Sequence, residues 1–175
     1  MRNVNEQILH YLGRIHENGK EKAHKAMSEL LEKILSKDNM NAAYKRVCAN
    51  KGAGGVDDVT VGELGGYIKE NWESIREQIR RREYKPQPVR RVEIPKPNGG
   101  VRELGIPTVM DRVIQQGIVQ VISPVCEPLF SECSYGFRPN RSCEMAVRQL
   151  LIYLNEGYEW IVDIDLERFF DNVPQ

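Results

Sequence analysis

The 175-residue sequence lacks the features that mark membrane, secreted or zinc-binding proteins. No apolar run approaches the roughly 18 residues that a membrane span needs, and the N-terminus lacks the pattern of a signal peptide. The four cysteines form no CxxC pair and the three histidines all lie within the first 24 residues, so neither a zinc site nor a disulfide scaffold is expected. These absences predict a soluble, intracellular (cytoplasmic) protein with reduced thiols and no membrane partner.

The formal net charge of the chain is zero, since 25 Lys/Arg balance 25 Asp/Glu. The charges are nevertheless unevenly distributed along the sequence. Residues 76–102 carry nine Lys/Arg against three Glu, a net charge of +6, and residues 158–175 carry a net charge of −4. One surface for polyanions and one for cations is what a metal-dependent nucleic-acid enzyme needs. A solvated helix face beside an acidic segment has the same charges, so charge alone leaves both interpretations open.

Hydrophobic spacing predicts that helices dominate residues 1–82. A short helix at residues 40–50 is expected to be capped by Asp38 or Asn39. A longer helix begins at about residue 60, and apolar residues recur along it every three or four positions. This stripe predicts a buried face, with its tryptophan in the core, made by Val61, Leu64, Ile68, Trp72, Ile75 and Ile79.

A glycine-rich segment, residues 51–58, separates these two helices. No strand precedes it and the GxxxxGK[ST] pattern is missing, so the segment is not expected to cradle a nucleotide. Its three glycines within four residues indicate an unusual backbone or the close approach of another chain segment.

The rest of the sequence predicts a mixed α and β portion. Two β-like runs, Val89–Pro95 and Val101–Ile106, flank a Pro-Asn-Gly-Gly sequence, which is the pattern of a hairpin. A helix at residues 109–130 is expected to kink or divide at Pro124. Its predicted apolar face consists of Ile114, Ile118, Val121, Ile122, Val125 and Leu129.

Acidic residues follow an apolar run near residue 160. After a helix capped by Ser142, residues 160–164 predict a buried strand. Asp163 and Asp165 are two residues apart and therefore point to the same side of such a strand. Carboxylates at a strand end are one way in which enzymes hold divalent cations. A strand end with solvated acids has the same spacing, so the spacing alone does not decide.

Four longer motifs occur in a fixed order along the chain. They are Asn50–Asp57, Ile94–Thr108, Ser134–Ser142 and Asp165–Val173. They resemble, in this order, the N-terminal RNA-contacting loop, the fingers hairpin, the SYGFRPxRS segment and the first catalytic motif of group II intron-encoded reverse transcriptases. The resemblance covers about three-quarters of the chain. The glycine-rich loop and SYGFRPNRS favour the intron type over retron and other bacterial reverse transcriptases.

The resemblance implies an α+β fold. A helical N-terminal extension (residues 1–38) would precede the fingers with their β-hairpin (39–141) and the first part of the palm (142–175) of a right-hand polymerase. Asp165 would be the catalytic, Mg²⁺-binding aspartate and the Leu166 carbonyl a second metal ligand. Asp163 either supports the site by its charge or only solvates the strand end. The family's Tyr-x-Asp-Asp motif does not occur in these residues. The sequence therefore contains the metal ligands of only one side of the family's two-metal site.

The resemblance also implies contacts to substrates. Lys96 and Arg102 would clamp the dNTP triphosphate, and Phe170 would exclude a 2′-hydroxyl by its bulk. Residues that would contact RNA are Lys51, Gly52, Gly54, Gly55, Arg80, Arg81, Arg82, Arg138 and Arg141. The last two arginines either hold the template or pair with the acids of the final strand.

The implied function is that of a reverse transcriptase fragment. The whole protein would bind intron RNA and template RNA, extend a DNA primer with dNTPs and two Mg²⁺ ions, and assist splicing, whereas these 175 residues alone would be inactive. A non-catalytic RNA-binding maturase module acting as a splicing cofactor is the alternative. The strand predicted at residues 160–164 would lack partner strands. Its exposed edge and apolar side would favour either a homodimer or a disordered tail from about Tyr158.

Overall fold

The computed structural model describes residues 19–166 of the chain, with side chains from residue 27 onward. Helices and one antiparallel hairpin make up these residues, so the predicted α+β class is confirmed. The chain divides into two compact units, residues 1–129 and 130–175. The domain boundaries implied by the family resemblance, which are defined by role in polymerisation, stay predictions. Residues 1–18, at the start of the stretch predicted to be mainly helical, and Phe170 lie outside the described residues.

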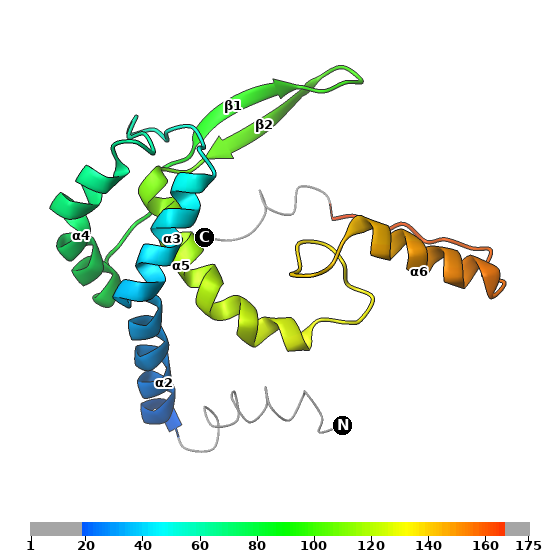
Figure 1. Cartoon of the computed structure of the whole chain (residues 1–175), viewed down its shortest axis with the longest axis horizontal. Coiled ribbons are helices and arrows are strands. Elements are labelled where there is room, and N and C mark those ends of the chain that lie inside the picture. Colours follow the sequence, from blue (N-terminus) through cyan, green and yellow to red (C-terminus); the bar gives the residue numbers. More distant parts are fainter. Residues whose placement is uncertain (1–18, 167–175) are drawn as a thin grey trace. The chain divides into compact units, whose positions relative to one another are not determined.

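The first unit contains four α-helices in its described part (Figure 1). These are α2 (Gly19–Ile34), α3 (Lys37–Ala49), α4 (Leu64–Arg80) and α5 (Val109–Cys126), which continues into the short 3₁₀ helix η1 (Glu127–Leu129). No helix among the described residues is both long and apolar enough to cross a membrane. The helices surround a small core in which α3 packs along α5.

The core is made by one face each of α3, α4 and α5. Its buried members are Met40, Ala43, Val47, Leu64, Val109 and Val113. The predicted stripe of α4 does face inward, since Leu64 and Ile75 are buried. Trp72, however, is only half-buried at the edge of this core, so its prediction as a core residue is correct only in part.

The buried face of α5 differs from the predicted one. Val109, Val113, Gly117 and Val121 are buried, whereas Ile118, Ile122, Val125 and Leu129 are exposed. The physical reason is a close helix crossing at Gly117. A Cβ there would lie 2.8 Å from Met40 Sδ, and the Gly117 carbonyl accepts a hydrogen bond from Asn39 Nδ2 at 3.0 Å. A glycine adds nothing to a hydrophobic pattern, so the pattern identified Val121 correctly but missed Val109, Val113 and Gly117.

Two helix boundaries also differ from the predictions. Helix α3 begins at Lys37, with Ser36 as its N-cap, rather than at residue 40 after Asp38 or Asn39. The Ser36 hydroxyl accepts a hydrogen bond from the Asn39 N–H at 3.4 Å, as N-cap serines do. Helix α5 runs through Pro124 and ends two residues later, although the proline lacks the N–H that would bond to the carbonyl four residues before it.

The predicted hairpin is confirmed. Strand β1 (Arg90–Pro95) pairs antiparallel with β2 (Val101–Ile106), and Arg90 lies opposite Ile106. The turn between them uses Gly99 and Gly100 at φ values of +85° and +81°, a region that other residues rarely adopt. Both strands are exposed along almost their whole length, and the hairpin extends away from the helices of its unit (Figure 1).

The second unit contains α6 (Cys143–Asn155) in its described part. Ser142 caps this helix as predicted, accepting a hydrogen bond from the Met145 N–H at 3.2 Å. The prediction of a buried strand at residues 160–164 is wrong for this structure: the segment has no strand pairing, and Trp160 is 93% exposed. The only strands among the described residues are β1 and β2, which pair with each other, so this apolar segment has no sheet to join.

Candidate nucleic-acid interface

The hairpin brings Lys96 and Arg102 to one face. Arg102 pairs with Ile94 across the two strands, so the two side chains point to the same side. The Lys96 N–H donates to the Gly100 carbonyl at 3.0 Å, so the ladder continues by one pair and Lys96 lies on the side of Ile94. The same face carries exposed Val92 and Leu104. Two exposed cations beside an apolar surface can hold the phosphates of a nucleotide next to its base.

A buried aspartate holds both ends of the hairpin. The Asp111 carboxylate, in the first turn of α5, accepts hydrogen bonds from Tyr84 Oη (2.6 Å), the Gln87 N–H (3.1 Å) and Thr108 Oγ1 (2.7 Å). Gln87 precedes β1 and Thr108 follows β2, so one side chain joins the segments that enter and leave the hairpin. Burial and the bond to Asp111 raise the pKa of Tyr84 far above its ordinary value, which keeps its hydroxyl a donor.

Sequence reasoning missed Asp111, although a signal was present. Thr108-Val109-Met110-Asp111 has the spacing of a capping box before an apolar run. In the structure Thr108 is the N-cap of α5, and its hydroxyl accepts a hydrogen bond from the Asp111 N–H at 3.1 Å. The pattern predicts this local pair but contains no information on the contacts to Tyr84 and Gln87.

The glycine-rich segment packs against the same helix end. A Cβ at Gly55 would lie 2.6 Å from the Thr108 Cα, so the predicted close approach of another segment is confirmed. Gly52 lies against the Arg112 guanidinium, whose Nη2 donates to the Ala53 carbonyl at 2.6 Å. Lys51 is exposed, with a φ of +47° just after α3. The RNA contacts implied for Lys51, Gly52, Gly54 and Gly55 stay predictions.

The three successive arginines at the end of α4 differ in their surroundings. Arg80 forms two hydrogen bonds with the carboxylate of Glu32 on α2, at 2.8 and 2.7 Å, and these bonds lower the pKa of Glu32. Arg81 pairs with Glu77 at 2.9 Å. Arg82 is exposed at a φ of +61° and has no ion-pair partner among the described residues. Of the three, Arg82 is therefore best placed to meet an external phosphate.

Arg138 and Arg141 of the second unit both stabilise the loop that precedes α6. Arg138 Nη1 donates to the carbonyls of Ser131 and Ser134 at 2.7 and 2.9 Å, and its guanidinium lies over the Phe130 ring. Arg141 contacts Glu132 through the carbonyl at 3.1 Å and the carboxylate at 3.4 Å. The loop geometry thus depends on both arginines, and their implied template contacts stay predictions.

The predicted metal ligands lie in the exposed segment of the second unit. Asp163, Asp165 and Leu166 are all exposed, and Asp165 Oδ1 accepts a hydrogen bond from the Leu166 N–H at 2.9 Å. A carboxylate and a backbone carbonyl are oxygen donors of the kind that Mg²⁺ prefers. Within residues 27–166 no three His, Cys, Asp or Glu side chains gather as a metal site would require. The donor chemistry therefore fits Mg²⁺, while a complete site requires further ligands.

Comparison with known proteins finds one family match and several similar proteins. Residues 94–175 match the family described as reverse transcriptase (RNA-dependent DNA polymerase). The chain is 35% identical over 165 residues to the group II intron-encoded protein LtrA of Lactococcus lactis subsp. cremoris, covering 93% of this chain and 27% of LtrA. It is 35% identical over 153 residues to protein YkfC of Escherichia coli (strain K12), covering 84% of this chain and 40% of YkfC.

A yeast protein that is also named after an intron is a further relative. The chain is 28% identical over 173 residues to the putative COX1/OXI3 intron 2 protein of Saccharomyces cerevisiae, covering 98% of this chain and 20% of that protein. The chain thus spans between one-fifth and two-fifths of the length of these relatives. Residues 94–175 thus match the reverse transcriptase family, and most of the chain is similar to group II intron-encoded proteins.

Proposed function

We propose that this chain is the part of an RNA-directed DNA polymerase that binds RNA and the incoming dNTP, and that the whole protein also assists intron splicing. The observation that carries the proposal is the exposed hairpin, on which Lys96 and Arg102 share one face within the residues that match the family. In the whole protein these two cations hold the triphosphate of a dNTP, and Phe170 excludes a 2′-hydroxyl.

The proposed reaction is the transfer of a nucleotide to the end of a DNA primer on an RNA template. Cations on the leaving phosphates stabilise the charge that develops there. Asp165 and the Leu166 carbonyl would hold Mg²⁺, with Asp163 adding negative charge nearby. When bound, the metal neutralises charge on the reacting phosphate. Carboxylates are needed on both sides of the metals, so these 175 residues alone do not polymerise DNA.

RNA binding is the part of the proposal that this chain can test directly. Arginines and lysines between residues 76 and 102 give this segment a net charge of +6, with Lys51, Arg138 and Arg141 as further contacts. Binding by many phosphate contacts releases counterions, so affinity falls steeply as salt rises. We expect fluorescence anisotropy with a structured intron RNA to show at least a tenfold loss of affinity between about 50 and 200 mM salt. Equal affinity at both salt concentrations, or no binding at the lower one, would contradict the proposal.

The proposed binding of dNTP by Lys96 and Arg102 has to be tested in a protein as long as the relatives, because the assay requires polymerase activity. There, Lys96→Ala and Arg102→Ala should raise the KM for dNTP in a primer-extension assay by a larger factor than they weaken RNA binding. The matched control is Arg91→Ala, because Arg91 lies on the opposite face of the hairpin, 3.9 Å from Glu103. An equal effect of all three substitutions would contradict the assignment of one face to the nucleotide.

A homodimer is a further part of the proposal. Residues 160–166 expose large apolar side chains with no covering element among the described residues, and exposed apolar surface of this kind favours association. A two-fold contact would cover the same surface on both copies. Light scattering over a range of protein concentrations should show a dimer, and a monomer at every concentration would contradict this part.

A further inference from the structure

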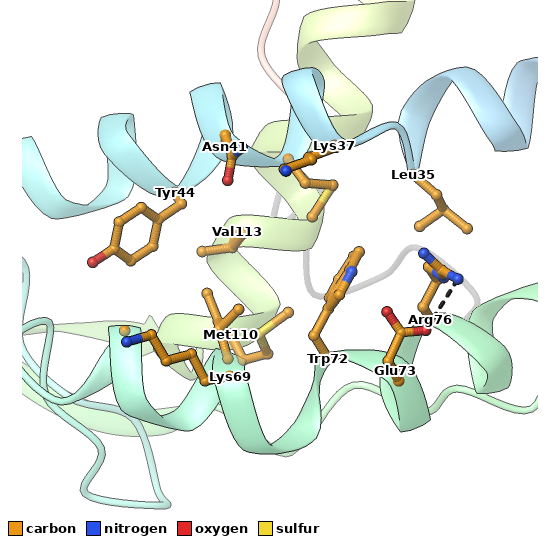
Figure 2. A pocket seen from close by; sticks show the side chains of 13 residues that line it. Leu35, Lys37, Asn41, Tyr44, Lys69, Trp72, Glu73, Arg76, Met110 and Val113 are labelled. Carbon is orange, nitrogen blue, oxygen red and sulfur yellow. Dashed lines mark ion pairs between the residues drawn. The ribbon is translucent and has the colours of Figure 1, made fainter.

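A cleft of about 470 Å³ lies between α3 and α4. Apart from Arg76, the first cation of the basic segment, no residue given an RNA or nucleotide contact above lines it. Helix α5 forms its floor with Met110 and Val113, and most of its remaining wall is apolar. Figure 2 shows side chains from α3 and α4 pointing into the cleft from opposite sides. Its volume lies within the roughly 300–1,000 Å³ of ligand pockets, so it is large enough for one flat ring system.

Two aromatic side chains define the shape of the cleft. Tyr44 enters from α3 and Trp72 from α4 (Figure 2). A Cβ at Gly65 would lie 3.1 Å from Tyr44 Oη, so the glycine lets the tyrosine hydroxyl lie against the backbone of α4. Trp72 packs on the core with part of its ring and leaves the rest open to the cleft. Flat aromatic walls of this kind stack on bases of any sequence.

The charged groups of the cleft are mainly cationic. Lys37, Lys69 and Arg76 line it together with one acid, Glu73. Glu73 pairs with Arg76 at 3.0 Å, whereas neither lysine forms an ion pair within residues 27–166. An apolar cleft with two unpaired ammonium groups is complementary to a ligand that has a flat apolar body and a negative charge beside it.

We propose that this cleft takes an unpaired base of RNA, with its ring between Tyr44 and Trp72 and its flanking phosphates on Lys37 and Lys69. The proposal rests on the RNA binding proposed above. It adds a site that binds single-stranded RNA in preference to paired RNA. A base inside a duplex is stacked and cannot enter the cleft without the cost of unpairing. The basic hairpin segment, in contrast, contacts phosphates that both forms of RNA present.

The sequence offers a direct optical test, since it has only two tryptophans. In a Trp160→Phe variant, Trp72 is the only tryptophan left, and Trp160 is an exposed residue far from the α3–α4 cleft in sequence. We expect a short unpaired oligoribonucleotide to quench the fluorescence of Trp72. A fully paired RNA hairpin of the same length should bind, as measured by anisotropy of labelled RNA, without the same quenching.

Two lysine substitutions provide the matched comparison. Lys69→Gln should weaken binding of the unpaired RNA by about fivefold to tenfold and reduce the quenching at saturation. Lys45→Gln removes the same charge from an exposed position on α3 that does not line the cleft, and should do neither. Circular dichroism of both variants verifies that each is folded.

The outcomes separate this inference from the function on which it rests. Binding of both RNAs without quenching of Trp72 overturns the base site alone. Equal quenching by paired and unpaired RNA, or equal effects of Lys69→Gln and Lys45→Gln, also overturns it. If neither RNA binds at low salt, the result contradicts both the base site and the proposed RNA binding.

Discussion

Replacing Asp111 should destabilise the first unit, because this carboxylate holds both ends of the hairpin. Asp111→Ala leaves three donors without their acceptor: Tyr84 Oη–H, the Gln87 N–H and Thr108 Oγ1–H. An unpaired buried donor costs about 1–3 kcal/mol. Thr108 is 1% exposed and bears the full cost, whereas water reaches the exposed Gln87 and the half-buried Tyr84. We therefore expect a loss of about 3 kcal/mol in the free energy of unfolding.

Asp111→Asn should cost less than Asp111→Ala. In the wild type, Oδ2 accepts two hydrogen bonds, from Gln87 and Thr108, and Oδ1 accepts one from Tyr84. An amide can place its oxygen at the Oδ2 position and its NH₂ toward the Tyr84 hydroxyl, which can accept as well as donate. Two of the three bonds are kept and the third reverses, so a loss of about 1 kcal/mol is expected.

Thermal unfolding followed by circular dichroism measures these differences. For a chain of this size about 1 kcal/mol corresponds to about 2–4 °C in Tm, so Asp111→Ala should lower Tm by about 6–12 °C. The matched control is Asp38→Ala, since Asp38 is an exposed aspartate in the first turn of α3 and should cost under about 1 kcal/mol. A Tm for Asp111→Ala within 2 °C of the control, or a larger loss for asparagine than for alanine, would refute this reasoning.

Four other predictions concern substitutions of single residues. Gly55→Ala should destabilise the protein by about 1–3 kcal/mol in denaturant titration, because its Cβ would lie 2.6 Å from backbone atoms of the α5 N-cap. Gly66→Ala, with no atom within 4 Å of the new Cβ, should stabilise α4 by up to about 1 kcal/mol. In RNA-binding titrations, Arg82→Ala should lower affinity more than Arg80→Ala, whose guanidinium is already paired; the reverse order would contradict this. In a protein as long as the relatives, Asp165→Ala should abolish DNA synthesis and leave RNA affinity nearly unchanged, as parallel activity and binding assays would show.

The features that sequence predicted correctly are those set by neighbouring residues. The Asn-Gly sequence between two β-like runs predicted the hairpin that the structure contains. The serine before α6 fixed the start of that helix. The apolar stripe of α4 faces inward because its spacing matches the helical repeat over four turns. In the turn and the helix cap the stabilising contacts lie within a few residues of one another, so the local pattern contains the necessary information. The stripe of α4 shows which face is buried, although the residues that cover it lie on α3 and α5.

The errors concern contacts between distant parts of the chain. Helix α5 is apolar on more than one face, and the face that is buried is decided by how closely α3 can approach Gly117. The segment at residues 160–164 has the composition of a buried strand, but burial requires a neighbouring strand, and the described residues contain none to pair with it. Apolar patterns show that a surface favours burial and do not show what covers it.

The candidate site depends on such distant contacts at one point, the N-terminus of α5. Thr108 packs against Gly55, Asp111 holds the two ends of the hairpin, and Arg112 donates to the carbonyl of Ala53. The glycine-rich segment and the hairpin are therefore fixed to the same five residues of the chain. A substitution in either element can shift the other through this helix end. Loss of nucleotide binding after a change in residues 51–58 would then be an effect on hairpin position, and amide hydrogen exchange of β1 and β2 would separate it from loss of a direct RNA contact.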